Sequence, residues 1–486
     1  LISLAAMSAE GLWLRSLGAQ RHDSMYLLLP LCMLFLFSLL RGRNGGQCRG
    51  GRAFSAAVYV VHPLCIVLVR GAAKVLGLEA LLVENSVLHF AAVLALSGLL
   101  AAPCLLPFRR RPDPTTRAWR EVDLVALGHN ARVLREALPP ETELMAVVKA
   151  EAYGHGGGST ARALQKAGVR AFAVSCLTEG IALRRAGVRG TILILGYTAP
   201  AEAPLLTRWH LTQTVADIDH GRALAAQGRR VHVHLALDTG MHRLGIPAEH
   251  REEILEVFRL PGLSVDGAFS HLCVSDSLEA GDVAYTREQL TLFDDTVAWL
   301  RAAGYDPGKV HIQSSYGLWN LPAQPCAYVR AGIALYGVRS DSAPVQRHFD
   351  LRPGLSLRAR VASVRTVQAG ESAGYGRAFR AEQETRLVVV TMGYADGLPR
   401  ELPQRGGQVL IRGRRCPMVG RMCMDQLLVD VGGLPEVFPG DVVTVIGRDG
   451  GQVIPVEELA QRCGTITNEV LSRLGARLPV VPLGRG

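Results

Sequence analysis

Paired cysteines and metal-binding spacings are missing from this sequence. Its 486 residues contain ten cysteines, with no CxxC pair and no histidine at a spacing suited to zinc. We therefore expect neither a disulfide framework nor a structural metal. Scattered, reduced thiols fit the cytoplasm best.

A secretion signal and a nucleic-acid-binding patch are missing as well. Residue 1 is Leu, and no basic segment with a small-residue cleavage site follows it, so we expect a chain that begins within a longer protein. The net charge is +10, but the basic residues flank apolar runs or stand singly on predicted helices, which argues against nucleic acid as a partner.

The first hundred residues are strongly apolar. Three runs stand out at residues 25–40, 55–69 and 86–108, and the last is long enough to cross a ~30 Å hydrocarbon layer. Arg41, Arg43, Arg49 and Arg52 follow the first run and Arg109 to Arg111 follow the third, so the positive-inside rule places both segments in the cytoplasm. We expect a multi-pass membrane region with everything after Phe108 in the cytoplasm.

One ionisable residue, His62, falls inside the second apolar run. An intramembrane histidine is either a functional group or a neutral side chain bonded to a neighbouring helix, and the sequence leaves both open.

Beyond residue 120, short β-branched runs alternate with amphipathic helical patterns. Eight such runs lie at residues 143–148, 171–176, 191–196, 212–215, 231–238, 263–270, 309–314 and 327–331. Eight βα units over roughly 200–250 residues predict an α/β fold of the (β/α)8 TIM-barrel type. From about 350, alternating strands such as 387–391 and 442–446, broken by Gly and Asp turns, predict a mostly β domain.

These patterns give a division of the chain. We predict a transmembrane helical region over 1–111, truncated at its N-terminus, a linker over 112–120, a barrel over 121–345 and a C-terminal β domain over 346–486.

Polar residues follow several predicted strands. Lys149, His271, Ser315 and Arg330 each stand where an apolar run ends, and the carboxyl ends of barrel strands meet at one mouth. A lysine there is costly to bury unless it is neutral, paired or covalently bonded, although it could also reach past the rim to solvent. The glycine-rich turn after Lys149, with Tyr153, can present N–H groups and a phenol to an anion.

The chain resembles the alanine racemase family over residues 118–480. The resemblance is carried by 146-AVVKAEAYGHG-156, 238-DTGMHRLG-245, 330-RAGIALYG-337, 374-GYGR-377, 393-GYADG-397 and 420-GRMCMD-425. It implies a pyridoxal 5'-phosphate (PLP) enzyme, an eight-stranded barrel followed by a β domain, and a head-to-tail homodimer with shared active sites.

Residue roles follow from the same resemblance. Lys149 looks like the lysine that carries PLP as a Schiff base and moves a proton on one face of the substrate, and Tyr375 of the partner chain looks like the opposite base. A racemase needs two such groups, one on each face of a planar intermediate. His271 and Arg330 are placed to lower the pKa of that phenol, with Arg330 facing the pyridine nitrogen.

The remaining roles concern binding. The resemblance implies that Tyr153, Ser315 and the backbone of Gly332 and Ile333 hold the phosphate. It implies that Arg243 and the backbone of Met424 hold the substrate carboxylate. Asp425 and Tyr394 are further candidates for substrate contact, and Tyr394 could equally pack with its hydroxyl satisfied.

Three positions depart from the family pattern. Asn468 stands where alanine racemases carry a tyrosine that contacts the phosphate and crowds the substrate methyl, so it opens volume and offers a hydrogen bond for a hydroxymethyl group. Ala236 replaces a lysine that is often carbamylated, and Ser314 replaces an asparagine. With the membrane-like region, these departures resemble the membrane-bound serine racemases of vancomycin-resistant bacteria, which have an acyltransferase-like membrane module.

We therefore predict interconversion of L- and D-serine, and also of alanine, supplying D-amino acids for altered cell-wall precursors. Two alternatives are an alanine racemase that tolerates serine and a non-catalytic PLP-binding module tethered to a membrane transporter. Tyr375 and its domain argue against the second, because a carrier needs no second base. A third alternative makes the membrane part an acyltransferase with the racemase as an appendage.

Overall fold

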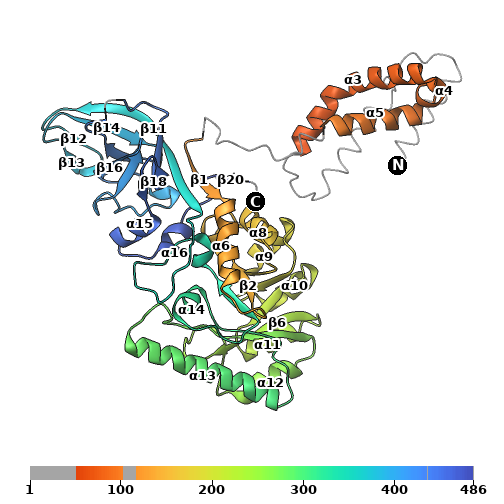
Figure 1. The fold of residues 1–486 in the computed structure, drawn as a ribbon, viewed down its shortest axis with the longest axis vertical. Coiled ribbons are helices and arrows are strands. Elements are labelled where there is room, and N and C mark those ends of the chain that lie inside the picture. The colour runs from red at the N-terminus through yellow and green to blue at the C-terminus, as the bar shows by residue number, and fades with distance from the viewer. Residues whose placement is uncertain (1–50, 102–115, 435, 485–486) are drawn as a thin grey trace. The chain divides into compact units, whose positions relative to one another are not determined.

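The computed structural model describes residues 51–101, 116–434 and 436–484. It divides into two compact units, residues 1–108 and residues 109–486 (Figure 1). Each unit is described by itself.

The described part of the first unit is helical. It contains α3 (Gly51–Leu76), α4 (Glu79–Leu82) and α5 (Ser86–Ala101). α3 and α5 pack together through Cys65, Val69 and Val93.

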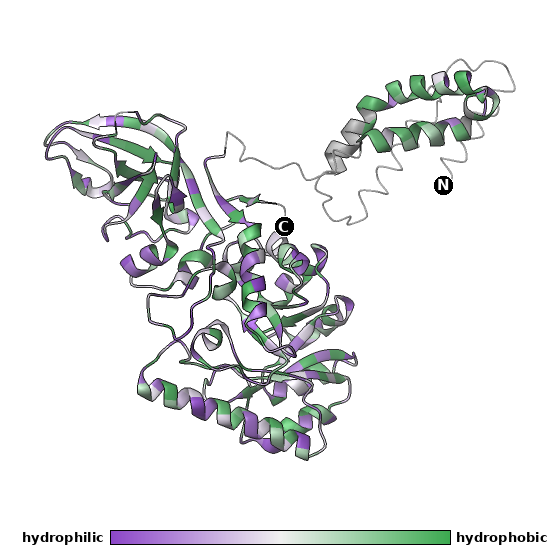
Figure 2. Cartoon of the chain, viewed as in Figure 1, coloured by the Kyte–Doolittle hydropathy of each residue, from purple (hydrophilic) through white to green (hydrophobic). Residues whose placement is uncertain are grey.

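This part of the structure corrects the membrane prediction. Within residues 51–101, 116–434 and 436–484, no helix combines the length and the apolarity needed to cross a membrane. α5 has 16 residues, about 24 Å at 1.5 Å per residue. α3 is longer but contains Pro63 and carries Arg70 and Lys74. Both helices are largely hydrophobic in Figure 2. The prediction of a multi-pass membrane protein, with the membrane as partner and the rest of the chain in the cytoplasm, is therefore contradicted. The run at 25–40 lies outside the described residues.

The second unit begins with the predicted barrel. Its strands are β2 (Glu143–Val147), β3 (Ala171–Val174), β4 (Thr191–Ile194), β5 (Thr212–Val215), β6 (Val231–Asp238), β8 (Leu263–Phe269), β9 (Lys309–His311) and β10 (Tyr328–Ala331). All run parallel in the order β10-β2-β3-β4-β5-β6-β8-β9. Backbone bonds from Ala327 to Val310 and from Arg330 to Gln313 join β9 to β10 and close the ring.

Helices follow most of these strands and cover the barrel. They are α6 (Leu124–Glu136), α8 (Gly157–Lys166), α9 (Leu177–Arg185), α10 (Ala203–Arg208), α11 (Ile218–Ala225), α12 (Arg251–Arg259), α13 (Ala280–Ala302) and α14 (Ser315–Asn320). The strands are mostly hydrophobic, whereas α13 alternates hydrophobic and hydrophilic residues along its length (Figure 2). Such alternation is expected for a helix with one face on a core and the other in water.

The C-terminal domain is built on a second, largely antiparallel sheet. Its strands are β1 (Ala118–Asp123), β11 (Leu355–Val367), β14 (Thr385–Val390), β15 (Gln408–Ile411), β16 (Arg414–Val419), β17 (Leu427–Asp430), β18 (Val442–Asp449), β19 (Gln452–Ile454) and β20 (Val480–Leu483). The sheet order is β19-β18-β15-β16-β17-β14-β11-β1-β20, and β18 also pairs with β11, which closes the central strands on themselves. Two helices, α15 (Val456–Arg462) and α16 (Thr467–Ser472), lie between this sheet and the barrel (Figure 1).

The predicted barrel and the mostly β domain after it are thus confirmed. One boundary differs. Ala118 already belongs to β1, which pairs antiparallel with β11 and parallel with β20, so the last residues of the predicted linker are part of the C-terminal sheet. β1 precedes the barrel in sequence but belongs to the sheet of the C-terminal domain, so the chain passes from that domain into the barrel.

Candidate active site

Lys149 follows β2 at the barrel mouth and starts an unusual turn. The turn, α7 (Lys149–Tyr153), is left-handed: Ala150, Glu151, Ala152 and Tyr153 all have φ between 50° and 55°. Left-handed helical backbone costs about 1–2 kcal/mol per L-residue. Strain of this kind persists only where surrounding contacts enforce it, and it concentrates at functional sites.

Two carboxylates hold the strained turn in place. Glu179 accepts hydrogen bonds from the backbone N–H of Ala150 at 2.7 Å and of Ser175 at 2.8 Å, which ties the turn to the end of β3. Glu151 accepts from the N–H of Gly157 at 3.1 Å, at the start of α8. These bonds fix the backbone from which the Lys149 side chain projects.

Lys149 stands in a positive environment. Burial lowers the pKa of Lys149, the charge of Arg243 lowers it further, and Glu179 acts in the opposite direction. Both effects favour the neutral amine, which is the nucleophilic form. The charge of Arg243 therefore acts on Lys149, so these two predicted site residues lie near each other.

Arg330, on β10, is completely enclosed beneath the mouth. Its Nη1 donates to the His311 ring Nδ1 at 2.6 Å, and its Nη2 donates to the carbonyls of Ser270 and Ile312 and to His271 Nδ1 at 3.2 Å. Burial lowers the pKa of Arg330 to about 10. Among the described residues no carboxylate pairs with it, so a buried cation is surrounded by neutral acceptors.

These bonds set the protonation of the neighbouring histidines. Because arginine can only donate, His271 Nδ1 must accept, which leaves the proton on Nε2. Burial, with the charges of Arg330, Arg243 and Lys149, lowers the pKa of His271 to about 3, so the ring is neutral at pH 7. His311 accepts from Arg330 in the same way, and its Nε2 donates to His234 Nδ1 at 2.9 Å.

A small polar cradle lies beside the turn. Ser315 Oγ accepts from the N–H groups of Gly332 at 2.9 Å and Ala334 at 3.3 Å. A Cβ added at Gly332 would lie 2.8 Å from the Tyr153 hydroxyl, so glycine is what lets the phenol approach the backbone. Ile333 begins a 3-10 turn directly after Gly332. The four predicted phosphate-binding residues therefore meet at one place.

Arg243 lies in the loop after β6, which is organised by Asp238. Asp238 Oδ1 accepts from the N–H groups of Gly240 and His242, and Oδ2 contacts the His242 ring at 3.0 Å. The loop leaves Arg243 exposed at the rim, where it can reach a ligand anion.

The second predicted catalytic residue, Tyr375, and the predicted substrate-binding residue Met424 lie on the β domain. Tyr375 is 68% exposed and follows β12 (Ser372–Ala373), and Met424 is 54% exposed. β12 and its partner β13 (Phe379–Arg380) lie at the end of the domain remote from the barrel (Figure 1). Tyr375 and Lys149 of one chain are therefore not brought together.

Tyr394, Met424 and Asp425 share one cluster of loops on this domain. The Met424 carbonyl accepts from the N–H of Ala395 at 3.0 Å, and the N–H of Tyr394 donates to the carbonyl of Cys423. Arg477 pairs with Asp425 at 2.6 Å. Tyr394 is half-buried against the core, in agreement with its alternative packing role.

Asp396 ties these loops together. It is fully buried, forms an ion pair with Arg117, and accepts from the N–H of Gly393 at 3.1 Å. The loops that carry Tyr394 and Met424 are thus fixed before any ligand binds.

Asn468 lies on α16, which packs against the left-handed turn. Its Oδ1 accepts from the Ser340 hydroxyl at 2.8 Å, and the N–H of Thr467 donates to the carbonyl of Ser340. Asn468 belongs to the C-terminal domain, but it is therefore hydrogen-bonded to the barrel of its own chain.

Sequence reasoning missed two residues of this site. Glu179 lies 30 positions from the lysine whose turn it holds, and local sequence carries no signal for that contact. His311 lies within the predicted strand at 309–314, and a polar residue inside an apolar run is the signal that could have marked it as a candidate.

Comparison with known proteins agrees with this geometry. The model of the alanine racemase N-terminal domain matches residues 122–340, and that of the alanine racemase C-terminal domain matches residues 354–482. An amino-acid racemase from Enterococcus faecalis is 41% identical, covering 98% of this chain and 68% of that protein. A serine/alanine racemase from Enterococcus gallinarum is 36% identical, with the same coverage.

Solved structures agree as well. Alanine racemase from Bacillus anthracis with bound L-Ala-P has a TM-score of 0.71 and 33% identity, over 76% of this chain and 96% of that one. Alanine racemase from E. faecalis has a TM-score of 0.69 and 32% identity, over 75% and 98%. The chain therefore belongs to the alanine racemase family and is an amino-acid racemase.

Proposed function

We propose that this protein is a PLP-dependent racemase that interconverts L- and D-serine, and also the enantiomers of alanine, by a two-base mechanism. The observation that carries the proposal is the convergence of Lys149, Arg243, His271 and Arg330 at one barrel mouth beside the cradle of Tyr153, Ser315 and Gly332. Enzymes of the alanine racemase family depend on PLP. When bound, PLP withdraws electrons from the substrate's α-carbon and makes its hydrogen acidic.

The residues present fit this cofactor. The cradle offers the Tyr153 and Ser315 hydroxyls and the backbone at Gly332 and Ile333 to a phosphate. Lys149 would bind the aldehyde. Arg330, a buried cation without a carboxylate partner among the described residues, would face the pyridine nitrogen and keep it unprotonated.

Replacing Gly332 with Ala is expected to weaken PLP binding at least about tenfold. The new Cβ would lie 2.8 Å from the Tyr153 hydroxyl and must displace it. PLP affinity is measured by titrating the apoenzyme and following its absorbance. Gly281→Ala is the matched control, because nothing lies within 4 Å of its Cβ. Unchanged PLP affinity in Gly332→Ala would show that the cradle is not the phosphate site.

Two proton carriers act on opposite faces of the substrate. Lys149 Nζ moves the proton on one face, and the Tyr375 hydroxyl moves it on the other. Because Tyr375 is exposed and remote from the barrel of its own chain, we infer that it enters the mouth of a second copy. A head-to-tail homodimer then forms two identical sites, each completed by the partner.

The site must also lower the pKa of the Tyr375 phenol, which is about 10 in water. Neutral His271 carries its proton on Nε2 and can donate it in a hydrogen bond to the phenolate oxygen. Arg330 holds the ring in that tautomer and adds positive charge. Arg243 and the partner's Met424 backbone hold the substrate carboxylate and so orient the α-hydrogen between the two bases.

The substrate preference rests on Asn468. Its Oδ1 is occupied by the Ser340 hydroxyl, which orients the amide and leaves its Nδ2 as a donor for a substrate hydroxyl. Serine/alanine racemase is the name of the E. gallinarum relative, which supports this choice. The D-serine formed would supply altered cell-wall precursors of the kind used in vancomycin resistance.

The direct test is the ratio of kcat/KM for L-serine to kcat/KM for L-alanine. We expect comparable values, or a preference for serine. A tenfold preference for alanine would contradict the serine assignment and leave an alanine racemase.

Replacing Asn468 with Tyr is expected to shift this ratio toward alanine by about tenfold or more. The larger side chain removes the volume and the donor used by the hydroxymethyl group. Asn85→Tyr, at an exposed asparagine of the other unit, directly before α5, is the matched control. A ratio that Asn468→Tyr leaves unchanged would rule out this residue as the determinant.

A further inference from the structure

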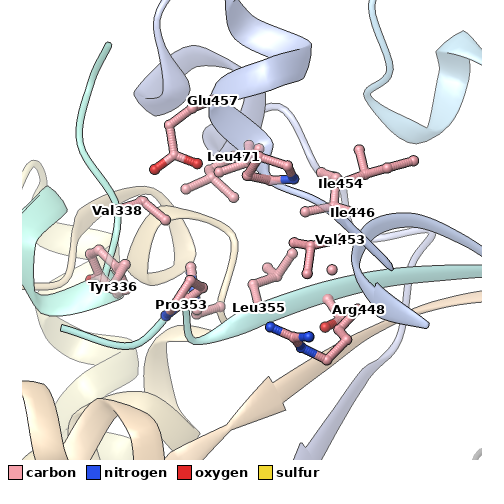
Figure 3. Close-up of a pocket in the computed structure, with 15 residues that line it drawn as sticks. Tyr336, Val338, Pro353, Leu355, Ile446, Arg448, Val453, Ile454, Glu457 and Leu471 are labelled. Atoms are coloured by element: carbon pink, nitrogen blue, oxygen red, sulfur yellow. The ribbon is translucent and has the colours of Figure 1, made fainter. Parts of the chain in front are cut away.

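Two loops at the barrel mouth carry residues whose positions matter for the proposed reaction. Residues 239–245, after β6, carry Arg243, and residues 270–273, after β8, carry His271. Figure 3 shows the cavity between the barrel and the β domain, and neither loop contributes to its lining. Support for the two loops comes from α13, which lies on the side of the barrel away from the β domain (Figure 1).

Tyr285, near the start of α13, holds the loop of Arg243. Its hydroxyl donates to the Gly240 carbonyl at 2.9 Å, and the N–H of Gly240 donates to Asp238 Oδ1, also at 2.9 Å. A Cβ added at Gly240 would collide with the Tyr285 hydroxyl, so glycine is what lets the phenol reach the backbone. The backbone three residues before Arg243 is therefore held at both its N–H and its carbonyl.

Gln289 lies one turn further along α13 and is 1% exposed. Its Nε2 donates to the Thr239 hydroxyl at 3.4 Å and to the His271 carbonyl at 3.3 Å. Its Oε1 accepts from the N–H of Cys273 at 3.1 Å. The spacing of four residues places Tyr285 and Gln289 on the same face of the helix. One buried amide thus bonds to both loops, with its donors and its acceptor in use.

The two loops are also joined to each other and to the centre of the site. The hydroxyls of Thr239 and Ser270 are 2.8 Å apart, and the Ser270 carbonyl accepts from Arg330 Nη2 at 2.7 Å. His271 is therefore held at its ring by Arg330 and at its carbonyl by Gln289. Loss of one of these partners leaves a buried polar group unsatisfied, which favours a displaced loop.

We propose that Tyr285 and Gln289 are positioning residues, which hold Arg243 and His271 in the arrangement that the racemase uses. They act through these two residues rather than on the substrate. The inference rests on the proposed function, in which Arg243 holds the substrate carboxylate and His271 donates to the phenolate of the partner's Tyr375. Tyr285 supports the first loop alone, whereas Gln289 supports both, so their substitutions have different effects.

Tyr285→Phe removes one hydroxyl and keeps the ring. Because only the hold on the substrate carboxylate is loosened, we expect KM to rise about threefold or more while kcat stays within about twofold. The substrate is whichever of L-serine and L-alanine the wild type racemises. Tyr305→Phe is the matched control: the Tyr305 hydroxyl accepts from Arg259 Nε at 3.0 Å, before β9 at the opposite end of the barrel. Its KM should equal that of the wild type.

Gln289→Leu removes all three bonds and nearly conserves volume. We expect the same rise in KM and, in addition, a shift of the acidic limb of the kcat/KM profile to higher pH by about half a unit or more. The reason is that a displaced His271 stabilises the phenolate less, which raises the pKa of the base. Tyr285→Phe should leave that limb in place. Gln165→Leu is the control, because Gln165 Oε1 accepts from the N–H of Arg189 before β4, at the opposite end of the barrel.

Amide hydrogen exchange in the intact enzyme without substrate gives a readout that is independent of racemisation. We expect faster exchange over residues 239–245 in both variants, and over residues 270–273 in Gln289→Leu alone. Wild-type kinetics or unchanged exchange in both variants of an active enzyme would overturn the inference and leave the proposed function standing. Tyr285→Phe alone decides between these results if Gln289→Leu does not fold. A wild type that racemises neither amino acid would instead refute the proposed function, and this inference with it.

Discussion

Lys149→Ala is expected to lower racemisation by about 10³-fold or more. In the proposed mechanism the substitution removes both the covalent attachment of PLP and the proton carrier on one face. A positioned acid–base group alone contributes about 10²- to 10⁴-fold. Racemisation is measured by the loss of optical rotation from L-serine. Lys309→Ala, on the exposed start of β9, is the matched control and should keep full activity.

The same prediction has a direct chemical readout. The whole chain contains four lysines, Lys74, Lys149, Lys166 and Lys309. Borohydride reduction of the PLP-loaded enzyme, followed by peptide mapping, should place the pyridoxyl label on Lys149 alone. Label on Lys166 or Lys309, or substantial activity in Lys149→Ala, would refute the assignment.

Tyr375→Phe is expected to abolish racemisation while PLP binding stays intact. The substitution removes one hydroxyl from an exposed loop of the β domain, whereas the cofactor cradle lies on the barrel. Because Lys149 remains, one enantiomer should still exchange its α-hydrogen with solvent deuterium. Absorbance of the bound cofactor near that of the wild type checks the binding.

A second exposed tyrosine provides the control for this variant. Tyr197 is 58% exposed and its ring lies against His220 on the barrel. Tyr197→Phe should racemise serine as the wild type does. Near-normal racemisation by Tyr375→Phe would contradict the two-base mechanism.

Much of the barrel was predictable because its signals are local. Each of the eight strands is a short apolar run, and a polar residue that follows a strand, such as Lys149 after β2 or His271 after β8, falls at the mouth by the geometry of the fold. The Gly332 position was likewise predictable, since its role follows from the adjacent strand.

Other features depend on contacts that the local sequence does not record. The left-handed turn from Ala150 to Tyr153 contains no glycine that would indicate it in the sequence. It is held by Glu179, which is distant in sequence. The first residues of β1 were predicted to be linker, because β1 pairs with β11, which lies more than 230 positions away. The apolar composition of α3 and α5 led to the prediction of membrane spans. In the structure the two helices pack on each other, and neither is long and apolar enough to cross a membrane.

Tyr375 presents the opposite case. Its motif suggested a catalytic role, yet its side chain is exposed. It follows β12, which lies at the end of the β domain remote from the barrel (Figure 1). In the proposed mechanism the two bases come from different subunits, so the site would be complete only when two chains meet.

Subunit complementation tests this arrangement directly. Lys149→Ala and Tyr375→Phe are co-expressed with different tags, and the mixed dimer is compared with each inactive parent. One of the two sites in the mixed dimer has both bases intact. Because mixed dimers make up about half of an equal mixture, that mixture should recover about a quarter of wild-type racemisation. A purified mixed dimer without activity would show that Lys149 and Tyr375 do not act together across the subunit interface.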